Sequence, residues 1–226
     1  PHPASRELRA LLRARRRARI DLLILTHGHP DHCGGLEALL EELPIAEIWL
    51  NGQILIEERD GAMERLLERA LRSGSKLRFA PELCATTHDF GEARFEVLWP
   101  CPRYDPALQL NDNSLTVRVT YGRRSFLMTG DLEAEAEDRL VARGSIMHAD
   151  VLKVAHHGSR TSTSEAFLHG ARPSVAVISS GAGNRYGHPS RAVLARLRDA
   201  GAEVLRTDVG GGVIVTTNGE SLEVRR

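Results

Sequence analysis

Segments with the period of strands alternate with segments with the period of helices along all 226 residues, and this alternation constrains the fold most. No low-complexity linker, internal repeat or change of composition interrupts the alternation. A chain of this length buries roughly 70% of its unfolded surface when it folds as one unit. We therefore predict a single mixed α/β (α+β) domain over residues 1–226, β-rich, with helices that cover the sheet faces.

The most regular segments define the expected elements. An apolar run at Ile20–Leu25 predicts a buried strand. Alternating apolar residues between Arg94 and Asp131 predict antiparallel strands. Further strands are expected over Val151–Ala155 and Val175–Ser179 and around Val204 and Val213. Helices are expected over Ser5–Arg13, after a cap at Asp60, over Glu133–Arg143, between Ser164 and Gly170, and between Ser190 and Gly201.

Composition excludes several classes of protein. Thirty Lys and Arg residues against thirty Asp and Glu residues give a net charge of zero, so global charge gives no reason to expect nucleic-acid binding. The apolar runs are shorter than the ~18 residues of a membrane-spanning helix. Aromatic residues make up 4% of the chain, which indicates no stacking platform for single-stranded DNA. A DNA strand would have to follow arginines such as Arg123, Arg124, Arg160 and Arg185.

The cysteines Cys33, Cys84 and Cys101 are odd in number and have no CxxC spacing. This pattern predicts neither a disulfide framework nor a zinc finger. We expect a reducing compartment and no cysteine-linked partner.

Three histidines and an aspartate lie within six positions directly after the first strand. Residues 26–32 read THGHPDH, and two glycines follow shortly after. Glycine and proline at a strand end favour a loop, where these side chains can converge on a cation. Imidazole nitrogens and carboxylate oxygens are suitable ligands for Zn, Mn or Fe ions. The motif predicts a metal site, since a surface cluster or a tag remnant would not follow a buried strand.

Two later strand ends carry residues of the same chemical kind. Thr129-Gly130-Asp131 ends one predicted strand, and its glycine lets the backbone approach a neighbour closely. Alone, Asp131 fits a plain helix cap equally well. His156-His157-Gly158-Ser159 follows another strand. The adjacent histidines favour metal ligation or substrate contact over a structural role.

In the order of these motifs the sequence resembles the metallo-β-lactamase superfamily. HxHxDH after a strand, Gly-Asp at a later strand end and His-Gly after a further strand carry the resemblance. It implies an αβ/βα sandwich with a dinuclear metal site at one edge. The chain is similar, over nearly its whole length, to the soluble C-terminal domain of the ComEC family of DNA-internalisation competence proteins. The segments that carry this closer likeness are NDNSL at 111–115, LMTGD at 127–131, LKVAHHGS at 152–159, YGHP at 186–189 and RTD at 206–208.

The resemblance also implies how ligands divide between two divalent metal ions, Mn or Zn. His27 and His29 would bind the first ion, and Asp31 and His32 the second. Asp131 would bridge the two ions.

His157 is expected to complete the second site and His156 to contact the substrate, although spacing leaves open which histidine is the ligand. Superfamily members supply a further metal histidine before the strand that precedes Gly-Asp, and this chain has no imidazole there. An oxygen ligand in that segment would favour a harder ion such as Mn. An ordinary turn fits the same residues almost as well. The candidates for metal or substrate contact in this segment are Asn111, Asp112, Asn113 and Ser114.

Family members place several strands ahead of HxHxDH, and these N-terminal strands are missing here. Together with Pro1 in place of Met, this predicts a fragment of a larger protein. The resemblance implies a soluble domain attached to a bacterial cell-membrane protein, with the membrane channel part in the same polypeptide. The sequence leaves open the side of the membrane.

The resemblance implies a metal-dependent hydrolase, a nuclease that degrades the non-transported DNA strand during DNA uptake in natural transformation. Two nearby cations lower the pKa of a water and stabilise the charge that forms on attack. Lys153, one of two lysines, could pair with a phosphate or with a carboxylate of the metal site. A solvent-facing strand position fits it nearly as well. The residues expected to take part in catalysis are Asp31, Lys153, His156, Ser159 and His188.

Two other functions fit the same residues. A degenerate, non-catalytic domain would bind DNA or act as a scaffold of the uptake channel. The retained HxHxDH and Asp131 disfavour it, because loss of ligands is the expected first sign of degeneration. A superfamily hydrolase acting on another phosphodiester, such as phosphocholine, is the second alternative.

Overall fold

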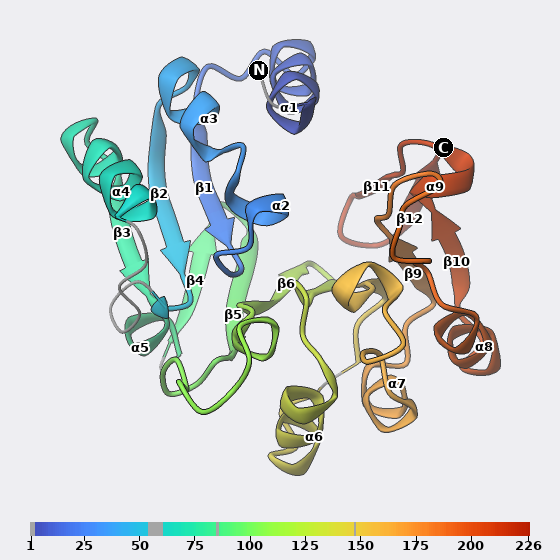
Figure 1. The fold of residues 1–226 in the computed structure, drawn as a ribbon. Helices are drawn as coiled ribbons and strands as arrows, with labels where there is room; N and C mark the ends of the chain where they lie inside the picture. The colour runs from blue at the N-terminus through green and yellow to red at the C-terminus, as the bar shows by residue number, and fades with distance from the viewer. Residues whose placement is uncertain (1–2, 54–60, 85, 147) are drawn as a thin grey trace.

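The fold of the chain, seen in a computed structural model that describes residues 3–53, 61–84, 86–146 and 148–226, is built on two large sheets (Figure 1). The first is three-stranded and parallel, with the order β1–β2–β3. The second is seven-stranded, with the order β10–β9–β8–β7–β6–β5–β4. Its strands β4 to β7 pair antiparallel and β7 to β10 pair parallel.

The strands of the first sheet are β1 (Ile20–Leu25), β2 (Ile45–Leu50) and β3 (Lys76–Phe79). Those of the second are β4 (Thr87–Phe90), β5 (Ala93–Trp99), β6 (Thr116–Tyr121), β7 (Arg124–Met128), β8 (Val151–Lys153), β9 (Val175–Ile178) and β10 (Glu203–Arg206). A separate hairpin consists of β11 (Ile214–Thr217) and β12 (Leu222–Arg225).

Helices flank both sheets. On the side of the first sheet are α1 (Pro3–Ala14), α2 (Pro30–Cys33), α3 (Leu36–Glu42), α4 (Ala62–Arg72) and α5 (Ala80–Leu83). Along the second sheet are α6 (Ala134–Ala142), α7 (Glu165–Ala171), α8 (Arg191–Asp199) and α9 (Thr207–Gly210). Two short 3₁₀ turns, η2 (Asn111–Asn113) and η3 (Ala155–Gly158), lie at strand ends.

The buried side chains show a four-layer sandwich. Trp49 of β2 packs with Val97 and Val117 of the second sheet, so the two sheets face each other. The other face of the first sheet packs against α3 and α4 through residues such as Leu39 and Leu67. The other face of the second sheet packs against α6, α7 and α8. This layering confirms the αβ/βα sandwich expected from the sequence.

The expected elements are found, with differences at their ends. The strand at Ile20–Leu25, the antiparallel strands after Arg94 and the helices capped by Ser164 and Ser190 are present, and both serines accept a hydrogen bond from their helix. The strand expected over Val151–Ala155 ends at Lys153, because the backbone turns into η3. The cap expected at Asp60 lies outside the described residues.

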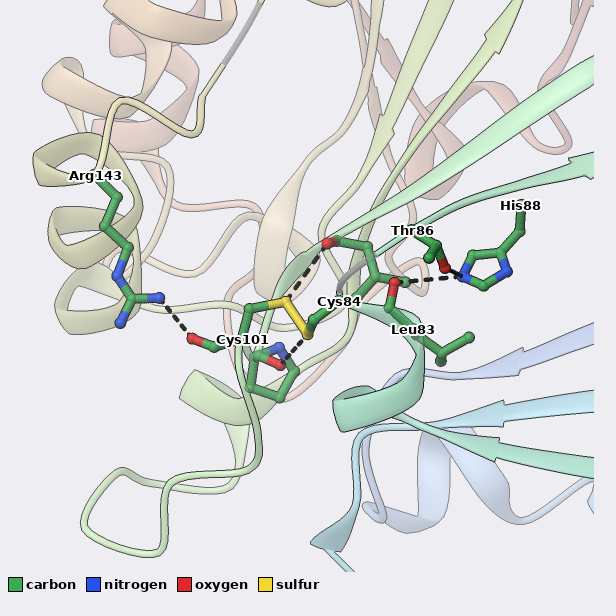
Figure 2. The surroundings of a disulfide bond; sticks show 8 residues. Leu83, Cys84, Thr86, His88, Cys101 and Arg143 are labelled. Atoms are coloured by element: carbon green, nitrogen blue, oxygen red, sulfur yellow. Dashed lines mark hydrogen bonds between the residues drawn. A yellow bond between two sulfur atoms is a disulfide. The ribbon is translucent and has the colours of Figure 1, made fainter.

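The expectation of no disulfide is wrong. Cys84 and Cys101 form one across 17 positions (Figure 2). Cys33 is free. The pairing of β4 with β5 explains the disulfide, because Thr87 lies opposite Glu96 and brings the start of β4 beside the end of β5. A search for local CxxC spacing misses such a pair. The disulfide also removes the basis for expecting a reducing compartment.

Within the described residues, no helix has the length and apolar character needed to cross a membrane.

Candidate metal centre

Three strand ends meet at one edge of the sandwich, and Gly130 is where they come closest. Gly130 follows β7 with a φ of +55°, a left-handed conformation that favours glycine. A Cβ atom there would lie 2.8 Å from the Cβ of Ser114 and 2.9 Å from the Cβ of Thr26. Glycine therefore allows the loops after β1 and before β6 to close on the loop that carries Asp131.

The loop after β1 holds its first histidines through their neighbours. His27 is buried, and its Nδ1 atom lies 3.2 Å from Oγ of Ser114 and 3.1 Å from Oγ1 of Thr26. Its Nε2 atom lies 3.0 Å from Nδ1 of His29. Burial, followed by the nearby His32, lowers the pKa of His27 to about 3. His27 is therefore a neutral imidazole at neutral pH, as a metal ligand must be.

Four ligand atoms converge beside this loop. One atom from each of Asp31, His32, Asp131 and His157 lies within 4.8 Å of the other three. Nε2 of His157 is 3.4 Å from Oδ2 of Asp31 and 3.5 Å from Oδ2 of Asp131. Nε2 of His32 is 3.2 Å from the same oxygen of Asp131. We call this group the four-residue cluster.

The cluster contains buried polar atoms that no hydrogen bond within the protein satisfies. They are Nε2 of His32, Nε2 of His157 and Oδ1 of Asp131. Buried polar atoms are nearly always partnered, and unpartnered ones require an explanation such as an ion. Two imidazoles and two carboxylates are a suitable ligand set for a divalent transition metal.

The pKa of Asp131 lies well below its ordinary range. Burial raises this pKa, but the close approach of His32, followed by the charges of His157 and Lys153, lowers it more. Asp131 is therefore an anion, the state in which a carboxylate binds a cation.

His156 and His157 both adopt left-handed backbone conformations, with φ of 45° and 53°. Nδ1 of His157 lies 2.7 Å from the carbonyl oxygen of Ser179, so this nitrogen donates and Nε2 keeps its lone pair. His156 differs, because its Nδ1 lies 2.7 Å from Oε1 of Glu133 and its Nε2 lies 4.0 Å from Asp131. The pKa of His156 is raised, and its hydrogen bond with Glu133 is the largest cause.

The side chain of Ser159 lies outside the four-residue cluster, two hydrogen bonds from Glu133 and three from His156. Its hydroxyl is 2.8 Å from that of Thr161, which donates to Glu133 over 2.7 Å. Sequence reasoning treated Glu133 only as a helix start and missed it. Its place two positions after Asp131, in the same loop, was the available signal.

Lys153 and His188 border the cluster. Nζ of Lys153 lies 3.3 Å from the carbonyl oxygen of Gly130, and burial lowers its pKa. The ring of His188 lies 5.7 Å from that of His156. Burial, then the charges of His156 and His157, lower the pKa of His188.

The segment at Asn111–Ser114 uses most of its side chains inside the protein. Oδ1 of Asp112 accepts from the backbone N–H groups of Glu133 and Ala136, each at 3.2 Å, at the start of α6. Asn113 is buried and makes three hydrogen bonds with the backbone of residues 105 and 109. Nδ2 of Asn111 lies 3.5 Å from Nδ1 of His156, and its Oδ1 atom is buried without a partner.

The comparison with protein families agrees with this arrangement. A family model described as "Metallo-beta-lactamase superfamily" matches residues 2–182. The chain belongs to this superfamily. Members of the metallo-β-lactamase superfamily typically bind divalent metals, usually zinc, and are generally hydrolases.

Curated relatives of this metallo-β-lactamase domain include a ComE operon protein and a competence protein. It is 36% identical over 194 residues to ComE operon protein 3 of Bacillus subtilis, which covers 86% of this chain and 24% of the relative. It is 35% identical over 196 residues to competence protein ComA of Neisseria gonorrhoeae, covering 86% of this chain and 25% of the relative. The chain thus spans about a quarter of the length of these relatives.

Among solved structures, a mutant of CmlA beta-hydroxylase matches with a TM-score of 0.52. The match covers 84% of this chain and 43% of the other at 13% identity, so it supports the fold alone.

Proposed function

We propose that this metallo-β-lactamase domain is a metal-dependent nuclease that hydrolyses DNA during DNA uptake in natural transformation. The observation that carries the proposal is the four-residue cluster, in which three buried atoms have no hydrogen-bond partner. The similarity to competence proteins supports DNA as the substrate and uptake as the setting.

The chain offers ligands for two ions, Mn or Zn. Asp31, His32 and His157 would hold one ion, and His27 with His29 the other. Asp131 would bridge them. Ions bound there would activate water and offset the negative charge that develops on a phosphodiester.

Other residues of the chain would bind and orient the phosphate. His156, held through Nδ1 by Glu133 and with a raised pKa, offers a charged N–H donor at Nε2 to a phosphate oxygen. Lys153 adds positive charge beside Asp131. His188 lies next to His156 at the outer edge of the cluster, where it can contact the same phosphate. Ser159 would act indirectly, since it reaches Glu133 through Thr161.

The test is hydrolysis of labelled DNA with Mn or Zn, with and without chelator. Wild-type protein is expected to cleave only with metal, and Asp31→Ala and Asp131→Ala are expected to be inactive. Asp89→Ala is the control, because it removes an exposed carboxylate from β4. Metal-loaded wild type that leaves DNA intact, yet binds it, would support the non-catalytic alternative. Cleavage of phosphocholine esters in place of DNA would support the second alternative, a hydrolase of another phosphodiester.

We also propose that the domain is attached to a larger bacterial membrane protein, on the side of the membrane where thiols are oxidised. The relatives are about four times as long as the match, and the Cys84–Cys101 disulfide is a bond of oxidising compartments. Thiol trapping in intact cells should label Cys33 and leave Cys84 and Cys101 unlabelled until a reductant is added. Labelling of all three without reductant would contradict this location.

A further inference from the structure

A row of side chains runs from the four-residue cluster to the surface of the loop after β9. The ring of His188 stacks on that of Tyr186, with centroids 5.8 Å apart and planes 17° apart. On the inner side, His188 lies 5.7 Å from His156, whose Nε2 is 4.0 Å from Asp131. Two ring contacts therefore connect Tyr186 to His156, which borders the cluster at Asp131.

Tyr186 is an exposed aromatic residue beside a cation. The residue is 66% exposed, so much of its ring surface faces solvent. The guanidinium of Arg185 lies 4.9 Å from the ring centroid and donates a 2.7 Å hydrogen bond to the tyrosine hydroxyl. An aromatic ring next to a cation combines the two contacts that proteins use for single-stranded nucleic acid, base stacking and phosphate binding.

The loop that carries Tyr186 is braced. Asn184 donates to the carbonyl oxygens of Gly181 and His188 at 2.9 and 2.6 Å, and accepts from the N–H of His188 at 3.0 Å. Pro189 packs on Gly158, where a Cβ atom would lie 2.6 Å from the proline Cβ. The brace ties the exposed ring to the η3 turn that carries His156 and His157.

We propose that Tyr186 and Arg185 form a binding subsite for an unpaired nucleotide next to the phosphodiester at the metal centre. Tyr186 stacks on the base, and Arg185 binds a neighbouring phosphate. In a duplex both faces of an internal base are covered by its neighbours, so the subsite selects single strands or frayed ends. This inference rests on the proposed function and names the form of DNA.

The experiment measures KM and kcat of the metal-loaded chain on a single-stranded oligonucleotide and on one of equal length built from stable abasic residues. Tyr186→Ala is expected to raise KM on the normal strand about 10-fold or more, with a small change in kcat. Tyr186→Phe keeps the ring and should stay within about twofold of wild type. On the abasic strand the Ala variant should equal wild type. Leu71→Ala is the control, because it shortens an exposed apolar side chain on α4.

A second readout does not depend on hydrolysis. In an Asp131→Asn background, binding should quench the fluorescence of 2-aminopurine in single-stranded DNA, and Tyr186→Ala should abolish the quenching. Equal losses on normal and abasic strands, or quenching that survives in the Ala variant, would overturn the subsite. Absence of DNA cleavage by wild type, with quenching that depends on Tyr186, would overturn the nuclease and leave the subsite standing.

Discussion

Polar side chains of two neighbouring regions differ in how they are satisfied. In the four-residue cluster, His32, His157 and Asp131 each have a buried atom with no partner in the protein. In the η2 turn, Asp112 and Asn113 are buried, and their side chains bond to the backbone around them. Both regions lie within runs of polar residues, and the sequence alone does not show which region would bind a metal.

The difference teaches what distinguishes a ligand from a support. A buried polar group that stabilises the fold finds its partner within the chain. A group whose atoms stay unpartnered costs stability and keeps those atoms available for something that the chain binds. Ser114 stands between the two classes, because it belongs to the turn and bonds to His27 and to the backbone N–H of Asp131.

The largest expected effect separates two buried aspartates. Asp131→Asn should reduce metal-dependent hydrolysis at least about 10³-fold, because several kcal/mol of charge stabilisation depends on the ions that this residue would bridge. It should also lower the bound metal measured by mass spectrometry. Asp112→Asn, the matched change in the η2 turn, should retain its metal. Equal metal loss in both variants would break the comparison.

The next effect concerns the stability of the fold. Asp112→Ala removes the acceptor for two backbone N–H groups at the start of α6 and should lower the free energy of unfolding by about 2 kcal/mol. Urea denaturation of the chelated protein measures it. Metal bound per folded molecule should stay unchanged, and a specific loss of metal would place Asp112 among the ligands.

Ser114 should give an intermediate result. Ser114→Ala leaves the ligands in place but removes the hydroxyl that orients His27, so metal affinity should fall about 10- to 100-fold. Titration with a competing chelator measures the affinity. Ser114→Thr, which keeps the hydroxyl, should recover part of it; no recovery would indicate a packing defect near Gly130.

The smallest effect, taken per pH unit, is a pH dependence of stability, of opposite sign for His27 at the metal centre and Asp112 in the η2 turn. The pKa of His27 is about 3 in the fold against an ordinary 6.5, so its contribution to stability is present above pH 6.5 and is lost as the pH falls toward 3. The slope should approach about 1 kcal/mol per pH unit. Burial raises the pKa of Asp112, so its contribution is lost as the pH rises through its folded value. Both are tested by the free energy of unfolding of the chelated protein, measured between pH 7 and pH 4. His27→Gln should flatten the slope of stability against pH that comes from His27.

The sequence predicted the elements with strong periodicity, and it brought out the candidate ligands that lie close together in the chain. The apolar strand at Ile20–Leu25 and the THGHPDH loop form a local pattern, and periodicity reports it directly. The disulfide was missed because Cys84 and Cys101 meet only through the register of β4 with β5. The row of rings formed by Tyr186, His188 and His156 was missed for a similar reason. A count of aromatic residues does not show where one ring lies.

The role of each candidate residue was harder to predict from the sequence than the set of candidate residues. The spacing left His156 and His157 equivalent, and only their partners, Glu133 and the carbonyl of Ser179, distinguish them. The sequence allowed Asp112 to be an oxygen ligand or part of an ordinary turn. It did not show the hydrogen bonds of Asp112 to the start of α6, because these depend on tertiary packing. The ligand assignment itself remains a prediction.

The η3 turn places two consecutive non-glycine residues, His156 and His157, in left-handed conformations. Such a conformation costs roughly 1–2 kcal/mol for each residue with a Cβ atom. Exchange of either histidine for glycine would relieve that backbone conflict while deleting an imidazole. Selection for thermal stability alone would therefore favour glycine over histidine at these two positions. A laboratory selection for heat-tolerant variants that does not assay DNA hydrolysis should yield inactive proteins with these substitutions.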